Sequence, residues 1–230
     1  MNQLQKEPAF DYSTMGMHVV STAGARNLSE EVMANGSMRV LPASFYADTT
    51  PAERGLLGMR HGIYGFLTLE LTDWLQARIA GRKAIEIGAG HGALAAALAI
   101  PATDNMMQDD PRVKAHYEAI GQPTVPYGDN VQRLDAKDAL VYHKPQVVIA
   151  SWVTHLYKKS RHAAGGNMFG VNEEHLISRC EEYIFIGNEQ VHKGKSIWEL
   201  PHEIIYPDWL YSRAVNGSRN FIAVWKGSNK

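Results

Sequence analysis

Apolar residues between Thr50 and Ala80 recur at steps of three and four, the spacing of one face of a helix. The series is Leu56, Met59, Ile63, Leu67, Leu71, Trp74, Leu75 and Ile79. Ahead of it, Thr50 fits a helix cap, Pro51 fits the first helical position, and Glu53 stands three residues after the cap. The pattern predicts a core-facing helix or helix pair over residues 50–80. Glycines interrupt the series, so we expect a break or a close backbone contact within it.

After Gly81 the pattern changes to short apolar runs that alternate with helical stretches. The predicted strands are residues 84–87, 99–103, 130–134, 146–151 and 183–187, followed by 202–205 and 221–225. Strands that alternate with helices imply right-handed crossovers and a mainly parallel sheet. Little helical pattern separates the last two strands, so we expect this pair to be antiparallel. The predicted fold class is α/β, a doubly wound, mainly parallel seven-stranded sheet flanked by helices.

The domain organisation follows from the same pattern. Residues 1–48 show no sustained periodicity and are interpreted as an N-terminal arm or cap. Residues 49–230 are expected to form a single domain, with a helical lead-in over 50–80, a core over 82–187 and antiparallel strands within 200–226. A length of 230 residues suits one elaborated domain better than two.

Composition and charge narrow the classes of function. The 23 basic and 24 acidic residues give a formal charge of -1, which provides no global attraction for nucleic acid and favours a small-molecule substrate. Cys180 is the single cysteine, so no intrachain disulfide can form and a cytoplasmic location is expected. The chain has no secretion-signal pattern and no long apolar run, so we expect no membrane contact.

A glycine-rich segment carries the clearest chemical signal. The residues from Lys83 to Ala95 have the pattern of a buried strand, a turn containing Gly88, Ala89 and Gly90, and an alanine-rich helix. Glycines let the backbone turn sharply and approach a ligand closely, and the start of the helix offers free N–H groups. The segment therefore predicts a site for a nucleotide-like ligand.

Glu86, Gly88, Gly90 and Gly92 fit the pattern acidic-x-Gly-x-Gly-x-Gly. The segment thereby resembles the first motif of the class I S-adenosylmethionine-dependent methyltransferases, and the resemblance extends over about residues 82–187. It implies a Rossmann-like methyltransferase fold with S-adenosylmethionine as cofactor. The glycine turn would contact the methionine part of the cofactor, and the acidic residue would anchor this region through the turn.

The resemblance also implies roles at the ends of the next two strands. Asp104 matches the acidic residue that accepts hydrogen bonds from both ribose hydroxyls, although it also fits an ordinary turn cap. Asp135 and Ala136 match the position that contacts the adenine amino group. Since sheets of this kind bind ligands at the carboxyl ends of parallel strands, all of these residues are expected at one site.

The same stretch also satisfies the dinucleotide fingerprint Gly88-x-Gly90-x-x-Ala93, which predicts NAD(P) instead. That fingerprint expects an acidic residue about 20 positions after its first glycine. Asp104 follows Gly88 by 104 − 88 = 16 positions, which is short. The acidic Glu86 and the long helical extension ahead of the motif favour the methyltransferase.

The end of the fourth strand is the usual substrate-facing position in the family. On this basis Ser151 is expected to contact the cofactor, Trp152 and Tyr157 are expected to contact the substrate, and His155 is the first candidate for a general base. The segment lacks the Pro-Pro-aromatic signature of amino-methylating nucleic-acid enzymes, and the chain has no Pro-Cys pair for cytosine-C5 chemistry. Common DNA-methylating classes are therefore disfavoured.

The segment after the fifth strand supplies further candidates. Asn188 is expected to contact the substrate, and Glu189 and His192 are additional catalytic candidates, although a plain polar loop fits equally. The ten histidines include no HExxH pair, so a metal ion is not predicted.

The loop over residues 163–170 is rich in glycine and is a candidate lid. One hypothesis is that it closes over the cofactor with Arg60, His61 and Tyr64, which would protect the loop from proteolysis; a plain flexible loop fits the sequence equally. Three functions stay open at this point. They are a methyltransferase, a degenerate methyltransferase-fold protein that binds cofactor or a partner, and an NAD(P)-dependent oxidoreductase.

Overall fold

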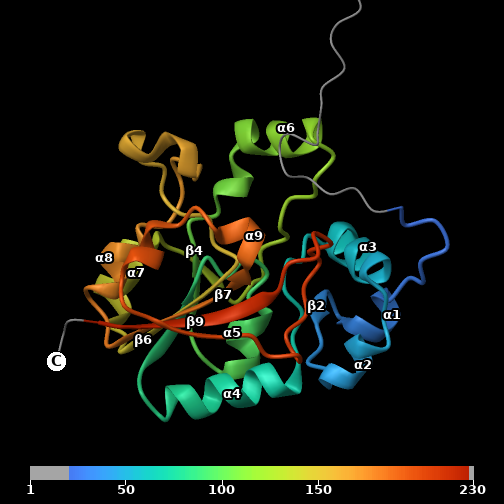
Figure 1. The fold of residues 1–230 in the computed structure, drawn as a ribbon, viewed down its shortest axis with the longest axis horizontal. Helices are drawn as coiled ribbons and strands as arrows, with labels where there is room; N and C mark the ends of the chain where they lie inside the picture. Colours follow the sequence, from blue (N-terminus) through green and yellow to red (C-terminus); the bar gives the residue numbers. More distant parts are fainter. Residues whose placement is uncertain (1–20, 228–230) are drawn as a thin grey trace, which may run out of the picture.

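The computed structural model describes residues 21–227 and is drawn in Figure 1. Within this range seven strands form one sheet with helices on both faces. Of the predicted N-terminal arm, residues 1–20 lie outside the described residues. Across residues 21–227, no helix is long and apolar enough to cross a membrane.

The large sheet has the strand order β5-β4-β3-β6-β7-β9-β8. Its strands are β3 (Ala84–Ile87), β4 (Ala102–Asp104), β5 (Val131–Arg133), β6 (Val147–Ser151), β7 (Glu182–Asn188), β8 (Glu203–Ile205) and β9 (Asn220–Lys226). The five strands from β3 to β7 are paired in parallel, whereas β9 is antiparallel to both β7 and β8. The predicted mainly parallel, seven-stranded sheet and its antiparallel C-terminal pair are confirmed.

Alternate residues of the central strands face opposite layers of helices, as the twofold periodicity of a strand requires. In β6, Val147 and Ile149 join the core shared with α4 and α5, while Val148 and Ala150 join the core shared with α7 and α8. The covering helices are α4 (Leu69–Ile79), α5 (Ala93–Leu98), α7 (Ala136–His143) and α8 (Glu173–Ile177). The two helical layers lie on opposite sides of the sheet in Figure 1, so burial on both faces accounts for the continuous apolar runs of the strands.

The predicted helix pair is α3 (Pro51–His61) followed by α4. Thr50 caps α3 in a capping box with Glu53, and Gly62 ends the helix in the left-handed region. The close backbone contact expected from the glycines is at Gly58, where an added Cβ would lie 2.5 Å from the Cβ of Arg213. The glycine therefore lets the segment that carries Arg213 lie directly against α3.

Residues 21–48 are packed onto the domain through short elements. These are α1 (Ser29–Val32), β1 (Met33–Ala34), β2 (Ser37–Met38) and α2 (Ala43–Ala47). Leu28, Val32 and Tyr46 are buried in the same core as α4, and the Tyr46 ring stacks on Phe66 at 5.2 Å between centroids. This part of the chain gains its order from contacts with the domain rather than from a periodic pattern of its own.

One strand begins later than the sequence pattern predicts. The apolar run over residues 99–103 suggested a strand from Ala99, but this residue caps the end of α5 in a left-handed conformation with φ 53°. The strand β4 begins only at Ala102. The first residues of this apolar run therefore belong to the end of α5 and to the connection after it, not to the strand.

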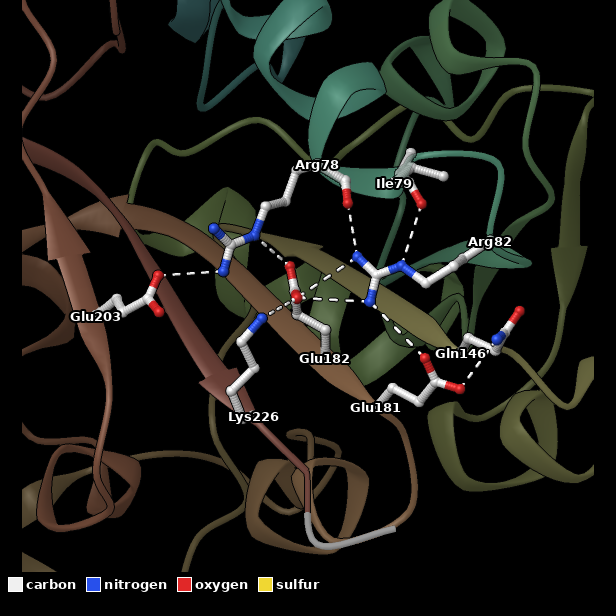
Figure 2. Close-up of polar contacts among 8 residues, drawn as sticks. All are labelled: Arg78, Ile79, Arg82, Gln146, Glu181, Glu182, Glu203 and Lys226. Atoms are coloured by element: carbon white, nitrogen blue, oxygen red, sulfur yellow. Dashed lines mark hydrogen bonds and ion pairs between the residues drawn. The ribbon is translucent and has the colours of Figure 1, made fainter. Parts of the chain in front are cut away.

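At the opposite end of the sheet from the glycine turn, Glu182 is the centre of an ion cluster (Figure 2). Its buried carboxylate contacts Arg78 at 2.5 Å, Lys226 at 2.6 Å and Arg82 at 3.4 Å. Burial raises the pKa of Glu182, but the hydrogen bonds from Lys226 and Arg78 outweigh it and hold the pKa below its usual value. The cluster ties α4 to the first residue of β7 and the last residue of β9.

Candidate active site

A cavity of about 1200 Å³ lies at the carboxyl ends of the parallel strands. β3 is paired with β4 on one side and with β6 on the other, so the strand order reverses direction at β3 and β6. In open α/β sheets this switch point is where ligands bind. The walls include the ends of β3, β4 and β6 together with residues of α3 and of the segment after α6 (Pro111–Ala119).

The glycine turn after β3 forms one wall of the cavity. Gly88, Gly90 and Gly92 all have positive φ, between 56° and 70°, and α5 begins directly after the last of them. At Gly90 an added Cβ would lie 2.9 Å from Val125, so both the backbone conformation and the available space require glycine there. Gly88, Ala89 and Gly90 line the cavity, whereas Gly92 shapes the turn without lining it.

Asp104 fixes the glycine turn from the end of β4. Its Oδ2 accepts a hydrogen bond from Gly90 N at 3.0 Å, and its Oδ1 accepts one from Met106 N at 2.7 Å. Burial raises the pKa of this carboxyl, and the two backbone hydrogen bonds oppose that rise. Because each carboxylate oxygen can accept more than one hydrogen bond, Asp104 can still serve a ligand in the cavity that it lines.

Glu86 lies beneath the turn and also lines the cavity. Its side chain is 3% exposed, and its Oε2 accepts a hydrogen bond from Ala95 N at 2.8 Å. Burial raises the pKa of Glu86 to about 8, the Ala95 N–H lowers it, and the nearby charge of Asp104 raises it further. The carboxyl is therefore protonated near neutral pH and links β3 to α5 as a neutral group.

The next predicted positions also reach the cavity. Asp135 is exposed, and its Oδ1 caps α7 by accepting from Lys137 N at 2.9 Å, while Ala136 lines the wall beside it. Ser151 and Trp152 follow from the end of β6, where Trp152 has a positive φ of 60°. Tyr64 completes this group, with its ring 6.0 Å from that of Trp152.

Of the candidate bases, His155 and His192 line the cavity and Glu189 does not. The Nε2 of His155 is buried without a hydrogen-bond partner among the described residues, and burial together with the nearby Lys195 lowers its pKa. The ring of His192 is buried, which lowers its pKa to about 3, and its Nδ1 accepts from Asn188 N at 3.0 Å. His155 therefore has a buried nitrogen without a partner among the described residues, whereas the Nδ1 of His192 is hydrogen-bonded within the fold.

Three other predicted residues lie outside the cavity, and each has a structural role that the sequence pattern did not reveal. Glu189 is paired with Arg219 at 3.0 Å. The Asn188 side chain is buried and donates to Ser218 O at 3.0 Å. The Tyr157 hydroxyl is hydrogen-bonded to His162 Nδ1 at 3.0 Å.

The candidate lid is only partly assembled as predicted. Gly165, Gly166 and other residues of the 163–170 loop line the cavity, as does Tyr64. Arg60 and His61 do not, and the Nε2 of His61 instead lies 2.8 Å from Ser29 Oγ, which ties it to the N-terminal segment. Neither residue lines the cavity in this structure, so the part of the lid that would involve them stays a prediction.

A buried ion pair supports the loop after β6. Lys195 Nζ donates to Glu173 Oε2 at 2.6 Å and to the backbone oxygen of Val153 at 2.9 Å, and both charged side chains are almost fully buried. Glu173 Oε1 also accepts from the Tyr183 hydroxyl at 2.8 Å. The Val153 backbone is thus held in place between Trp152 and His155.

Sequence reasoning missed several residues of the cavity wall. His91 occupies a variable position of the glycine motif, and burial lowers its pKa to about 4. Tyr117 lies on α6, and Tyr127 and Arg213 lie in irregular segments; all three reach the wall through tertiary packing. Among residues 21–227, no cluster of three His, Cys, Asp or Glu side chains suits a metal ion.

No protein-family model matches the sequence, and no curated protein is significantly similar to it. Among solved structures, a Thermoplasma acidophilum protein designated 1320 is 16% identical with a TM-score of 0.37, over 70% of this chain and 90% of that one. The magnesium protoporphyrin IX methyltransferase of Synechocystis PCC 6803, with bound S-adenosylmethionine, is 17% identical with a TM-score of 0.35, over 68% and 79%.

The tRNA (uracil-54, C5)-methyltransferase of Pyrococcus abyssi, in complex with S-adenosylhomocysteine, is 13% identical with a TM-score of 0.36, over 68% of this chain and 37% of that one. The strand order and the glycine turn after β3 confirm the predicted doubly wound, Rossmann-like α/β fold.

Proposed function

We propose that this protein is an S-adenosylmethionine-dependent methyltransferase that acts on a small molecule. The observation that carries the proposal is the hydrogen bond from Gly90 N to Asp104, which joins the glycine turn to the acidic residue after β4 at the switch point of the sheet. The turn offers a close backbone approach for the amino-acid end of the cofactor, and Asp104 and Asp135 offer acceptors for its ribose and adenine. All of these groups line one cavity.

The antiparallel strand β9 favours this cofactor over a dinucleotide. A dinucleotide site in a Rossmann fold uses two parallel βαβαβ halves. In this chain the second half has β6 and β7, but the next neighbour in the sheet is the antiparallel β9. The half of the sheet that would hold the second nucleotide therefore has an antiparallel strand where a dinucleotide site has a parallel one.

Bound S-adenosylmethionine would supply an activated methyl group, which the substrate nucleophile takes by in-line displacement at the methyl carbon. The protein then has to orient the nucleophile, exclude water and accept a proton where one is released. Trp152 and Tyr64 offer aromatic surfaces for orientation. His155 is the candidate base, because its lowered pKa keeps the ring neutral at pH 7 and its buried Nε2 has no hydrogen-bond partner among the described residues.

Calorimetric titration with S-adenosylmethionine, S-adenosylhomocysteine and NADPH tests the cofactor. We expect the first two to bind, with affinity reduced more than about 10-fold in Asp104→Ala, which loses charge-assisted hydrogen bonds, and in Gly90→Val, which is strained and meets Val125. Asp138→Ala, at an exposed position of α7, is the control for the first change.

Gly81→Val is the control for the second change, because Gly81 has a similar positive φ but open space around it. Both controls should bind as the unaltered protein does. Binding of NADPH alone would contradict the proposal. No binding of any of the three would favour a degenerate, partner-binding protein.

A further inference from the structure

Arg213 is a charged residue of the cavity wall to which the proposed function assigns no role. It lies on the connection between β8 and β9, and its backbone N donates to Tyr64 O at 2.9 Å. The centre of its guanidinium lies 3.8 Å from the centroid of the Tyr64 ring, and its stem passes over Gly58 of α3. These contacts hold the side chain in one position before any ligand arrives.

None of the ion pairs among residues 21–227 includes Arg213. Its guanidinium therefore has no anionic partner in this part of the chain. Its Nη2 donates only to the neutral Gln122 Oε1, at 3.3 Å, and its Nη1 is buried without a partner. An unsatisfied charged donor in a buried position is costly, so such a group usually has a ligand or a structural partner. Arg219 shows the contrast, since it also lies over a tyrosine ring, that of Tyr206, but is paired with Glu189.

The charges of the cavity wall are arranged unequally. Among the described residues that line it, Arg213 is the single Lys or Arg, while the acidic residues lie at the ends of other strands: Asp104 is the last residue of β4, Asp135 follows β5, and Glu86, neutral near pH 7, lies within β3. A ligand that reaches both regions would place its hydroxyl and amino groups near the carboxyls and an anionic group near the guanidinium. One guanidinium without a second cation suits a monoanion, and its planar pair of N–H donors matches a carboxylate.

We propose that Arg213 binds the carboxylate of a ligand in this cavity, with its orphan Nη1 as one of the two donors. Tyr64 and Tyr117 line the same cavity as Arg213. The inference deepens the proposed function and rests on it. The carboxylate has two possible sources, the amino-acid end of the cofactor and an acidic substrate bound beside it.

Arg213→Gln tests the proposal, and Arg219→Gln is the matched control because it makes the same change at an exposed arginine that also lies over a tyrosine. Calorimetry would use S-adenosylhomocysteine, which has the carboxylate, and 5′-methylthioadenosine, which lacks the amino-acid end. Benzoate, added to protein saturated with S-adenosylhomocysteine, is the probe for an acidic substrate. Thermal melting without ligand reports on folding.

If the cofactor is the source, Arg213→Gln weakens S-adenosylhomocysteine by about 10- to 100-fold and leaves 5′-methylthioadenosine unchanged, as expected for a lost charge-assisted hydrogen bond. If an acidic substrate is the source, both nucleosides bind to the variant as they bind to the unaltered protein, and benzoate binding is lost. In either case the melting temperature without ligand should not fall, because the fold loses an unpaired charge.

Binding of all three probes to Arg213→Gln as to Arg219→Gln would overturn the inference. A loss of both nucleosides together with a lower melting temperature would also overturn it, because Arg213 would then support the fold. Failure of the unaltered protein to bind either nucleoside would instead contradict the proposed function. The two failures are therefore distinguishable.

Discussion

At the scale of single residues, two neighbouring carboxyls of the site differ in how deeply they are buried and in how many hydrogen bonds they accept. Asp104 accepts from two backbone N–H groups and is partly exposed, whereas the more deeply buried Glu86 accepts from one. Burial favours the neutral form, and each N–H donor favours the charged form. Glu86 is consequently the neutral member of the pair near pH 7.

The raised pKa of Glu86 predicts an unusual dependence of stability on pH. Between its unfolded pKa of 4.5 and its folded pKa of about 8, the folded protein holds a proton that the unfolded chain lacks. The free energy of unfolding therefore falls as pH rises through this window. Relative to Glu86→Gln, which keeps an acceptor oxygen for Ala95 N, the melting temperature should fall by about 3 °C per pH unit. If the melting temperatures of the two proteins change equally with pH, the assignment is contradicted.

His155 predicts a dependence of turnover on pH. Its pKa lies below 6.5, so the rate for a substrate that must lose a proton should decline as acid protonates the ring. His155→Gln should lower the maximal rate by about 10²-fold or more and remove this acid limb. S-adenosylhomocysteine formation measures the rate, and titration with the same compound should show unchanged affinity. Equal rates for both proteins would exclude His155 as the base.

The site could be predicted from the sequence only where its residues follow the strands directly. Glu86, Asp104 and Asp135 were located because a strand, a turn and an acidic residue occur in a fixed order. Asn188 and Glu189 also follow a strand but belong to the fold, because their partners Ser218 and Arg219 lie about 30 residues away along the chain. A local sequence pattern does not indicate hydrogen-bond partners that are so distant along the chain.

At the scale of elements, the loop from His155 to Val171 bridges the ends of β4 and β6. Asn105, which follows β4, donates from Nδ2 to Phe169 O at 2.9 Å, and Asn167 Nδ2 lies 3.7 Å from Met107 Sδ. Isolated bridges join His155 to Val171 and Leu156 to Asn167. The base of the loop is therefore fixed by contacts that also border the cavity.

Limited trypsin digestion tests whether this loop closes over a ligand. Lys158, Lys159 and Arg161 lie within it, and we expect saturating S-adenosylhomocysteine to slow cleavage there several-fold, because closure removes the extended backbone that a protease needs. Cleavage after the exposed Arg179, which does not line the cavity, should stay constant. Unchanged cleavage at all of these sites would show that the loop is not a lid.

At the scale of the whole molecule, the two ends of the sheet have different roles. The carboxyl ends of the parallel strands hold the cavity, and the opposite end holds the Glu182 cluster of Figure 2. Glu182 contacts three cations, and its side chain is 1% exposed. Its loss would remove the buried counter-charge that the three cations share, although Arg78 would keep Glu203 and Arg82 would keep Glu181 as partners.

Glu182→Gln should therefore lower stability without changing the site. We expect the free energy of unfolding in urea to fall by about 2 to 4 kcal/mol, because one partner of a buried ion cluster is removed. The neighbouring Glu181 is 45% exposed and lies 3.8 Å from Arg82, so Glu181→Gln should cost less than about 1 kcal/mol. Both variants should bind S-adenosylhomocysteine normally, and weaker binding in Glu182→Gln would show that the two ends are coupled.

Most of the fold could be predicted from the sequence because its strands are buried on both faces and therefore appear as uninterrupted apolar runs. The position of β9 between β7 and β8 could not, because an apolar run such as residues 221–225 does not specify its neighbours. The packing of residues 21–48 was also hidden, since Leu28 and Tyr46 are isolated apolar residues whose partners, such as Phe66, belong to other segments.

The place of β9 affects how the chain can fold during its synthesis. β7 and β8 are made earlier, yet each depends on β9 for an edge partner, and β8 has no other partner in the described chain. Until Asn220–Lys226 leave the ribosome, the seven residues of β7 present an unpaired, apolar edge on which another strand can pair. Translation that pauses before Asn220 would therefore produce an aggregation-prone chain in which the cavity-forming strands are already complete.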